Sequence, residues 1–198
     1  MGTHCVIGYF LTTIQFRDFF LWVKSLSEYS GFRDCISLSE RQMDESFDIE
    51  LVSRYLVFTM CDDGVLGSID ELGSFLTDNM VEHAKNNSFD TDAVGSSFKR
   101  VFDYLSQTLG DNSFKKFDLV KDKYLGATLI SVFEVVASGL GYAVLEGFSL
   151  PDPEEFKRLH KNILDNPDII RAIKPGVRAS TRLPQTVKYG RGLFANES

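Results

Sequence analysis

The stretch YLGATLISVFEVVASGLGYAVLEGF, residues 124–148, constrains the fold more than any other part of the sequence. Between Leu125 and Leu145 the only charged residue is Glu134. A run of this length is long enough to span a bilayer, but neither a second span nor a flanking basic cluster supports insertion. We therefore favour a central helix that is buried on nearly all sides. Since a lone buried carboxylate is energetically costly, Glu134 is expected to have a partner.

Further helices are predicted on either side of this stretch, because apolar residues recur there every three or four positions. They cover residues 7–29, 46–60, 68–87, 91–109, 153–164 and 168–174. Residues 32–45 are mixed and polar, so we expect a connector there. Ser46 is predicted to cap the second of these helices, and Ser68 with Glu71 to form a capping box on the third.

The pattern as a whole indicates the fold class, since no alternating strand pattern longer than a few residues and no internal repeat occurs. We predict an all-α fold, a compact bundle of about seven helices around the central apolar helix at about 124–148. With 198 residues, the chain is expected to form a single helical domain, residues 1–198. Residues 1–31 hold the apolar, Phe-rich first helix, and residues 171–198 form a basic C-terminal segment.

The cysteine pattern bears on the cellular compartment. The chain has three cysteines, Cys5, Cys35 and Cys61, which lie far apart and form no CxxC pair. This spacing is typical of reduced cytosolic thiols and not of a disulfide framework. The first residues, MGTHCVIGYFLTT, lack the basic region of a signal peptide. We therefore expect a cytoplasmic protein.

Residues that carry catalytic or metal chemistry form no recognisable motif. None of the three histidines, His4, His83 and His160, lies at a spacing used by zinc ligands. The chain has no GxSxG elbow and no glycine-rich phosphate loop followed by lysine. We expect no metal, no cofactor and no catalytic residue, although a Ser–His or Cys–His pair that forms only in space stays open.

Charge is distributed unevenly along the chain. The net charge is −7, yet residues 171–198 contain six basic residues and one acidic residue. Such segregation can create a local positive patch that attracts phosphate. The candidate nucleic-acid or anion-binding residues are Lys174, Arg178, Arg182, Lys188 and Arg191. The alternative is that this basic segment packs against the acidic helices of the same protein.

Four stretches together resemble one protein family. They are FDIELVSRYLVFTMCDDGVLGSIDELGSFLTDNM, FKRVFDYLSQTLGDNSFKKF, LGATLISVFEVVASGLGYAV and STRLPQTVKYGRGLF. The positions that carry the likeness are Arg54, Gly110, Phe114 and the pair Phe133-Glu134. In this order they resemble the helical region of the GmrSD-like restriction proteins, which begin with a ParB/sulfiredoxin-like catalytic domain. The likeness covers about residues 47–194, or 16–194 at its widest.

The resemblance implies a non-catalytic role. The catalytic signature of that family, Asp-Gly-Gln-Gln-Arg, occurs nowhere in this chain, and the paired histidines of an HNH-type nuclease are also missing. The chain is similar only to the helical region that follows the catalytic part, so no catalytic residue carries over. A piece of a DNA-targeting, antiphage-type system is what this likeness implies.

Arg54 is the position in this likeness that invites a structural interpretation, because it lies in the middle of an apolar helix. Buried arginines are usually paired, so we expect an ion pair with Glu134 or with an aspartate of another helix. The other interpretation is a contact with a bound anion.

Two hypotheses for the function follow. The first is a helical accessory domain of a restriction-like defence protein, with DNA or a nuclease subunit as its partner. The second is a protein-interaction module without a nucleic-acid role, which packs or dimerises through the Phe-rich first helix. The second hypothesis predicts an exposed apolar patch on that helix. Neither hypothesis includes a membrane.

Overall fold

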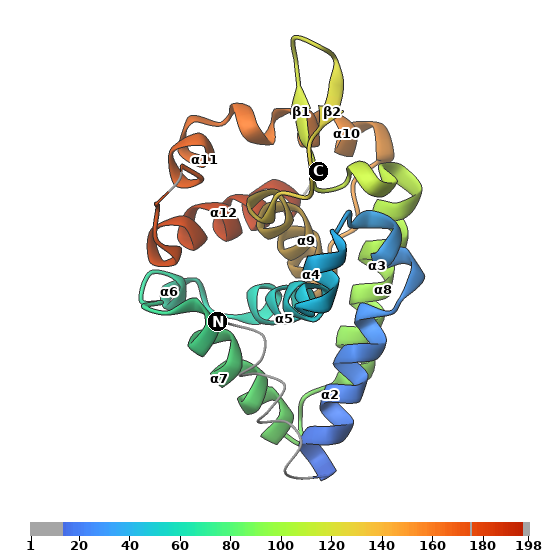
Figure 1. The fold of residues 1–198 in the computed structure, drawn as a ribbon, viewed down its shortest axis with the longest axis vertical. Helices are drawn as coiled ribbons and strands as arrows, with labels where there is room; N and C mark the ends of the chain where they lie inside the picture. The colour runs from blue at the N-terminus through green and yellow to red at the C-terminus, as the bar shows by residue number, and fades with distance from the viewer. Residues whose placement is uncertain (1–13, 175, 196–198) are drawn as a thin grey trace.

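The computed structural model describes residues 14–174 and 176–195. Within these residues the chain forms α-helices, two short 3-10 helices and one two-stranded sheet (Figure 1). The α-helices are α2 (Ile14–Ser27), α3 (Ser30–Cys35), α4 (Glu40–Asp44), α5 (Phe47–Met60), α6 (Asp63–Leu66), α7 (Leu72–Lys85), α8 (Thr91–Thr108), α9 (Ile130–Leu145), α10 (Pro153–Asn162), α11 (Pro167–Ala172) and α12 (Ala179–Phe194). The predicted all-α fold is confirmed.

Helix α9 forms the centre of the fold, as the apolar stretch predicts. Most of its residues are buried, and it packs against α5, α8 and α12 (Figure 1). Phe133 of α9 contacts the rings of Phe102 and Phe114, which belong to a larger set of buried aromatic side chains. Because aromatic side chains bury large areas, this set dominates the hydrophobic core.

The closest packing in the core is between α9 and α12, and it depends on two glycines. A Cβ atom on Gly190 of α12 would lie 2.1 Å from the carbonyl oxygen of Val135 in α9. A Cβ atom on Gly139 would in turn lie 2.5 Å from the carbonyl group of Gly190. Only residues without a side chain allow the two backbones to approach this closely. The two helices therefore cross with their backbones in contact.

Several predicted boundaries differ from the structure. The central helix begins at Ile130 and not near residue 124, because Lys123–Leu125 form the short strand β2. The predicted connector at 32–45 contains most of α3 and all of α4, so the bundle has more helices than expected. Part of the predicted first helix, residues 7–13, lies outside the described residues.

The two predicted helix caps are also different in the structure. Ser46 does precede α5, but its backbone is left-handed (φ 56°) and its side chain makes no capping hydrogen bond. The capping box of Ser68 and Glu71 is wrong, because α7 begins only at Leu72. Instead, the carboxylate of Glu71 caps this helix by accepting hydrogen bonds from the backbone N–H groups of Gly73 and Ser74. The acidic residue thus takes the place that the sequence assigned to serine.

A β-hairpin projects from the helical body (Figure 1). Strand β1 (Lys116–Asp118) pairs antiparallel with β2 (Lys123–Leu125), with Phe117 opposite Tyr124. The side chain of Asp118 stabilises the turn by accepting hydrogen bonds from the backbone N–H groups of Val120 and Lys121. Aspartate favours turns because it can bond to the backbone two or three residues ahead. The hairpin lies beside α10.

The length and composition of the helices bear on the membrane interpretation. Among the described residues, no helix is both long enough and apolar enough to cross a membrane.

Candidate functional site

Glu134 lies at the centre of a buried charge cluster. Its side chain has no exposed surface, and its Oε1 atom accepts a hydrogen bond from Nη1 of Arg54 at 3.2 Å. The expected ion pair between Arg54 and Glu134 is therefore present. Arg54 also donates two hydrogen bonds to Glu50, one helical turn earlier in α5, at 2.7 and 3.1 Å.

The second cation of this cluster comes from the basic segment. Arg182 of α12 donates from Nε to Oε2 of Glu134 at 3.1 Å and from Nη2 to Oε1 at 3.0 Å. Thr186 lies one turn further along α12 and donates its hydroxyl to Oε2 at 3.0 Å. The cluster balances two carboxylates, Glu50 and Glu134, with two guanidinium groups, Arg54 and Arg182. All this hydrogen bonding makes the burial of the Glu134 charge tolerable.

Arg191 also makes its contacts within the protein. Its guanidinium group donates to Asp63 Oδ1 at 2.7 Å and to the backbone carbonyls of Phe58 and Cys61 at 2.7 and 2.8 Å. It also lies over the ring of Tyr142, 4.7 Å from the centroid. The carbonyl groups at the end of a helix lack partners within the helix, and a cation there interacts favourably with the helix dipole. Arg191 therefore stabilises the end of α5.

The other three candidate anion-binding residues remain at the surface. Lys174 and Arg178 are exposed before and at the start of α12, and Lys188 is exposed further along it. Lys188 lines a cavity of about 590 Å³ together with Arg191, Asp62 and Asp63. The two aspartates offset the positive charge of this cavity. The described part of the basic segment thus divides into internal contacts and exposed cations, and the cavity that Lys188 and Arg191 line also contains two aspartates.

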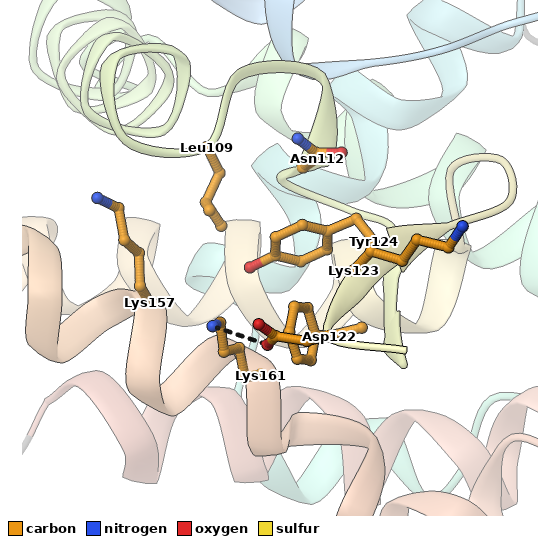
Figure 2. Close-up of a pocket in the computed structure, with 8 residues that line it drawn as sticks. Leu109, Asn112, Asp122, Lys123, Tyr124, Lys157 and Lys161 are labelled. Carbon is orange, nitrogen blue, oxygen red and sulfur yellow. Dashed lines mark ion pairs between the residues drawn. The ribbon is translucent and has the colours of Figure 1, made fainter. Parts of the chain in front are cut away.

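A different positive pocket, which sequence reasoning missed, lies between the hairpin and α10 (Figure 2). This groove has a volume of about 520 Å³. Its lining residues are Leu109, Asn112, Phe117, Asp122, Lys123, Tyr124, Lys157 and Lys161. Three lysines thus face one aspartate. The lysines come from two distant parts of the sequence, and only the packing of the hairpin on α10 brings them together.

Neighbouring side chains hold the aromatic ring of Tyr124 in place. Tyr124 packs edge-on against Phe117, with ring centroids 4.9 Å apart, and against His160, with centroids 5.5 Å apart. The backbone carbonyl of Ser113 lies 2.8 Å from Nε2 of His160. A carbonyl can only accept, so Nε2 donates, and Nδ1 is left to accept from the hydroxyl of Tyr124 at 3.5 Å.

Burial sets the protonation of these groups. It lowers the pKa of His160 to about 4, although the hydrogen bond to Ser113 opposes this shift. Burial also raises the pKa of Tyr124 to about 12. His160 is thus a neutral imidazole at physiological pH and Tyr124 a neutral phenol. The floor of the groove is uncharged, and its positive charge comes from the lysines at its edge.

The ion pairs of Lys157 and Lys161 in the groove are weak, because they are exposed to solvent. Lys161 lies 3.8 Å from Asp122, and Lys157 lies 2.7 Å from Glu154. The carboxylates of both pairs are at least 80% exposed, so solvent screens them strongly. Lys161 also packs over the Phe117 ring, 4.4 Å from its centroid. A phosphate group can therefore compete for these ammonium groups at little cost.

Metal ligands and reactive cysteines are the two kinds of chemical group that remain to be placed in the described part of the chain. Within residues 14–174 and 176–195, no three His, Cys, Asp or Glu side chains come together as metal ligands do. Burial raises the pKa of the Cys35 thiol to about 12 and also raises that of Cys61, so neither is activated as a nucleophile. His4 and Cys5 lie outside the described residues.

Comparisons with known proteins give no family assignment. No protein-family model matches the chain, and neither a curated protein nor a solved structure is significantly similar to it.

Proposed function

We propose that this chain is a non-catalytic helical accessory domain that contacts nucleic acid through the groove between the hairpin and α10. The observation that carries the proposal is that Lys123, Lys157 and Lys161 line one groove together with the ring of Tyr124. Proteins that bind nucleic-acid strands combine cationic side chains, which contact phosphates, with aromatic rings, on which bases stack. The groove offers both in one concavity.

The groove supports this role better than the C-terminal segment does. Arg182 and Arg191 make ion pairs inside the protein, so a phosphate would have to displace Glu134 or Asp63 to reach them. In the groove, Lys157 and Lys161 pair with solvent-exposed carboxylates, so a phosphate has to replace only weak, screened contacts. The antiphage context rests on the resemblance to the GmrSD-like restriction proteins and is part of the proposal.

Two triple variants with equal charge changes test the location. The groove variant is Lys123→Gln, Lys157→Gln, Lys161→Gln, and the matched control is Lys174→Gln, Arg178→Gln, Lys188→Gln. Binding of labelled DNA and RNA strands is measured by fluorescence anisotropy over a range of salt concentrations. The proposal expects the groove variant to bind at least about tenfold more weakly, with a shallower salt dependence. An equal loss in both variants, or no binding by the native protein at low salt, contradicts it.

A second candidate function is protein interaction, and the tip of the hairpin favours it. Val120 is 96% exposed and Leu119 is 52% exposed, so two adjacent aliphatic side chains project into solvent. On α2, Phe19 is buried and Leu21 is 47% exposed. Sedimentation velocity of the native protein and of Leu119→Ser, Val120→Ser tests this candidate. A self-associated native protein that the variant makes monomeric would support it, whereas monomers in both cases exclude a dimer through this tip.

A further inference from the structure

We infer that the groove accommodates one unpaired nucleotide unit, with the base on the ring of Tyr124 and the phosphate at Lys157 and Lys161. This inference rests on the proposed function. It adds that the site selects an unpaired nucleotide over a base-paired one. Four features support it: the volume of the groove, the fixed ring, the distribution of charge around the ring and a polar side chain beside it.

The size of the groove corresponds to a small ligand. Pockets for small ligands typically have volumes of about 300–1,000 Å³, and this one has about 520 Å³. A base that is paired and stacked within a duplex cannot offer its face to a side chain in such a concavity. A nucleotide at a strand end, in a loop or in a single strand can do so, because its base is free to leave the stack.

The ring of Tyr124 is held in a fixed position for stacking. Phe117 and His160 contact it edge-on, and the hydroxyl group donates to His160. The side chain remains half-buried and lines the cavity, so part of the ring surface is accessible from the groove. A ring that is already immobilised loses little conformational entropy when a base stacks on it.

The lysines surround this ring on different sides. Figure 2 shows the ammonium groups of Lys123 and Lys157 on opposite sides of Tyr124, and Lys161 directed toward Asp122. Lys157 and Lys161 lie one turn apart on α10 and thus on the same face of the helix. A phosphate between them would replace contacts with exposed carboxylates. Lys123 is then placed for the neighbouring phosphate along a strand.

Asn112 gives the groove a neutral polar group. Its side chain lines the cavity, and an amide can both donate and accept hydrogen bonds at the edge of a base. The remaining lining residue without charge, Leu109, is apolar. The groove thus combines a stacking surface, two phosphate contacts and one edge contact, which is the set that a single nucleotide requires.

The test separates this inference from the proposed function by comparing four probes. They are a labelled single-stranded oligothymidylate, the same strand in a duplex, inorganic polyphosphate and a free nucleoside monophosphate. We expect the single strand to bind at least about tenfold more tightly than the duplex at equal salt, since stacking requires an unpaired base. Competition by the free monophosphate would support the inference, because one nucleotide then suffices to fill the groove.

Two substitutions isolate the stacking contact. Tyr124→Leu removes the ring and should weaken single-strand binding about tenfold, while polyphosphate binding stays unchanged. Tyr124→Phe keeps the ring and should preserve single-strand binding. In the native protein, ultraviolet crosslinking of a bromouridine-containing strand should place the adduct at Tyr124, so the test does not depend on the folding of a variant.

Two outcomes would overturn the inference. Duplex binding as tight as single-strand binding, with no effect of Tyr124→Leu, would leave a phosphate-binding groove and thus the proposed function alone. Failure of the native protein to bind any of the polyanions would overturn both.

Discussion

Arg182 binds both carboxylate oxygens of Glu134, with Nε 3.1 Å from Oε2 and Nη2 3.0 Å from Oε1. This bidentate contact joins α12 to α9 at a point where Glu134 is fully buried. Arg182, which its sequence context marks as a surface cation, therefore pairs with a buried carboxylate while 22% of its side chain stays exposed. Charge-assisted bidentate pairs are stronger and more specific in geometry than single hydrogen bonds, so this pair fixes how α12 lies on α9.

Removal of the Glu134 carboxylate should destabilise the protein strongly. In Glu134→Ala, Arg54 and Arg182 lose the anion between them and remain as buried or half-buried charges. Breaking a buried ion pair from one side costs about 3–5 kcal/mol. Urea unfolding measured by circular dichroism should show this loss. The exposed pair of Arg41 and Glu45 provides the control, and Arg41→Ala should leave the unfolding midpoint unchanged.

The close crossing of α9 and α12 makes Gly190 sensitive to a single methyl group. Gly190→Ala would bring Cβ to 2.1 Å from the Val135 carbonyl oxygen, so the helices must move apart. We expect a loss of stability of about 3 kcal/mol, at the upper end for overpacked cores. Gly192→Ala is the matched control on the same helix, because its Cβ would meet no atom within 4 Å. Equal melting temperatures for the two variants would contradict the crossing described above.

His160 should make the stability depend on pH. Burial lowers the pKa of His160 to about 4 in the folded protein, below its unfolded value of about 6.5. The unfolded chain therefore binds more protons between these values, and stability falls as the pH drops through this window. From pH 7 to pH 5 the loss attributable to His160 is about 2 kcal/mol.

His160→Gln tests this assignment, because glutamine does not titrate. The variant should have a lower stability at pH 7, where the native contacts of the imidazole are intact, but a flatter dependence between pH 7 and pH 5. The difference between the two pH profiles is the quantity to measure. Parallel profiles would show that other groups govern the acid sensitivity.

Arg191 is predicted to act on stability and not on anion binding. Arg191→Ala removes the contacts with the Phe58 and Cys61 carbonyls and leaves these acceptors without that partner. We expect the free energy of unfolding to fall by about 2 kcal/mol, as for other buried hydrogen-bonding groups that lose a partner. Thermal unfolding of Arg191→Ala beside the exposed neighbour Lys188→Ala measures the difference. Similar melting temperatures in both variants would refute the structural role of Arg191.

Much of the helical framework is predictable from the sequence. The apolar stretch around Glu134 forms the central helix, and the three- and four-residue periodicity predicts α5, α7 and α8 within a few residues. The need of a buried carboxylate for a cation also indicates Arg54 as a partner. These features depend on local patterns, which a sequence displays directly.

Features that depend on tertiary pairing escaped sequence reasoning. The strands at Lys116–Asp118 and Lys123–Leu125 have only three residues each, too few for a recognisable alternation. The proximity of Lys123 to Lys157 and Lys161 depends on this hairpin, so no local pattern in the sequence indicates it. In the same way, nothing local distinguishes Arg182, which pairs with Glu134, from the exposed Arg178, because the distinction arises from where α12 begins: Arg178 is its extended N-cap, and Arg182 lies within the helix that packs on α9.

The order of synthesis gives the pairing of α9 with α12 a further consequence. The ribosome makes Glu134 well before Arg182, Thr186 and Gly190, so a nascent chain that ends ahead of α12 carries an apolar helix with an incompletely neutralised carboxylate. Such an intermediate leaves part of its hydrophobic core exposed, and exposed apolar surface is what chaperones bind. Completion of this core therefore requires the synthesis of α12 and its packing on α9.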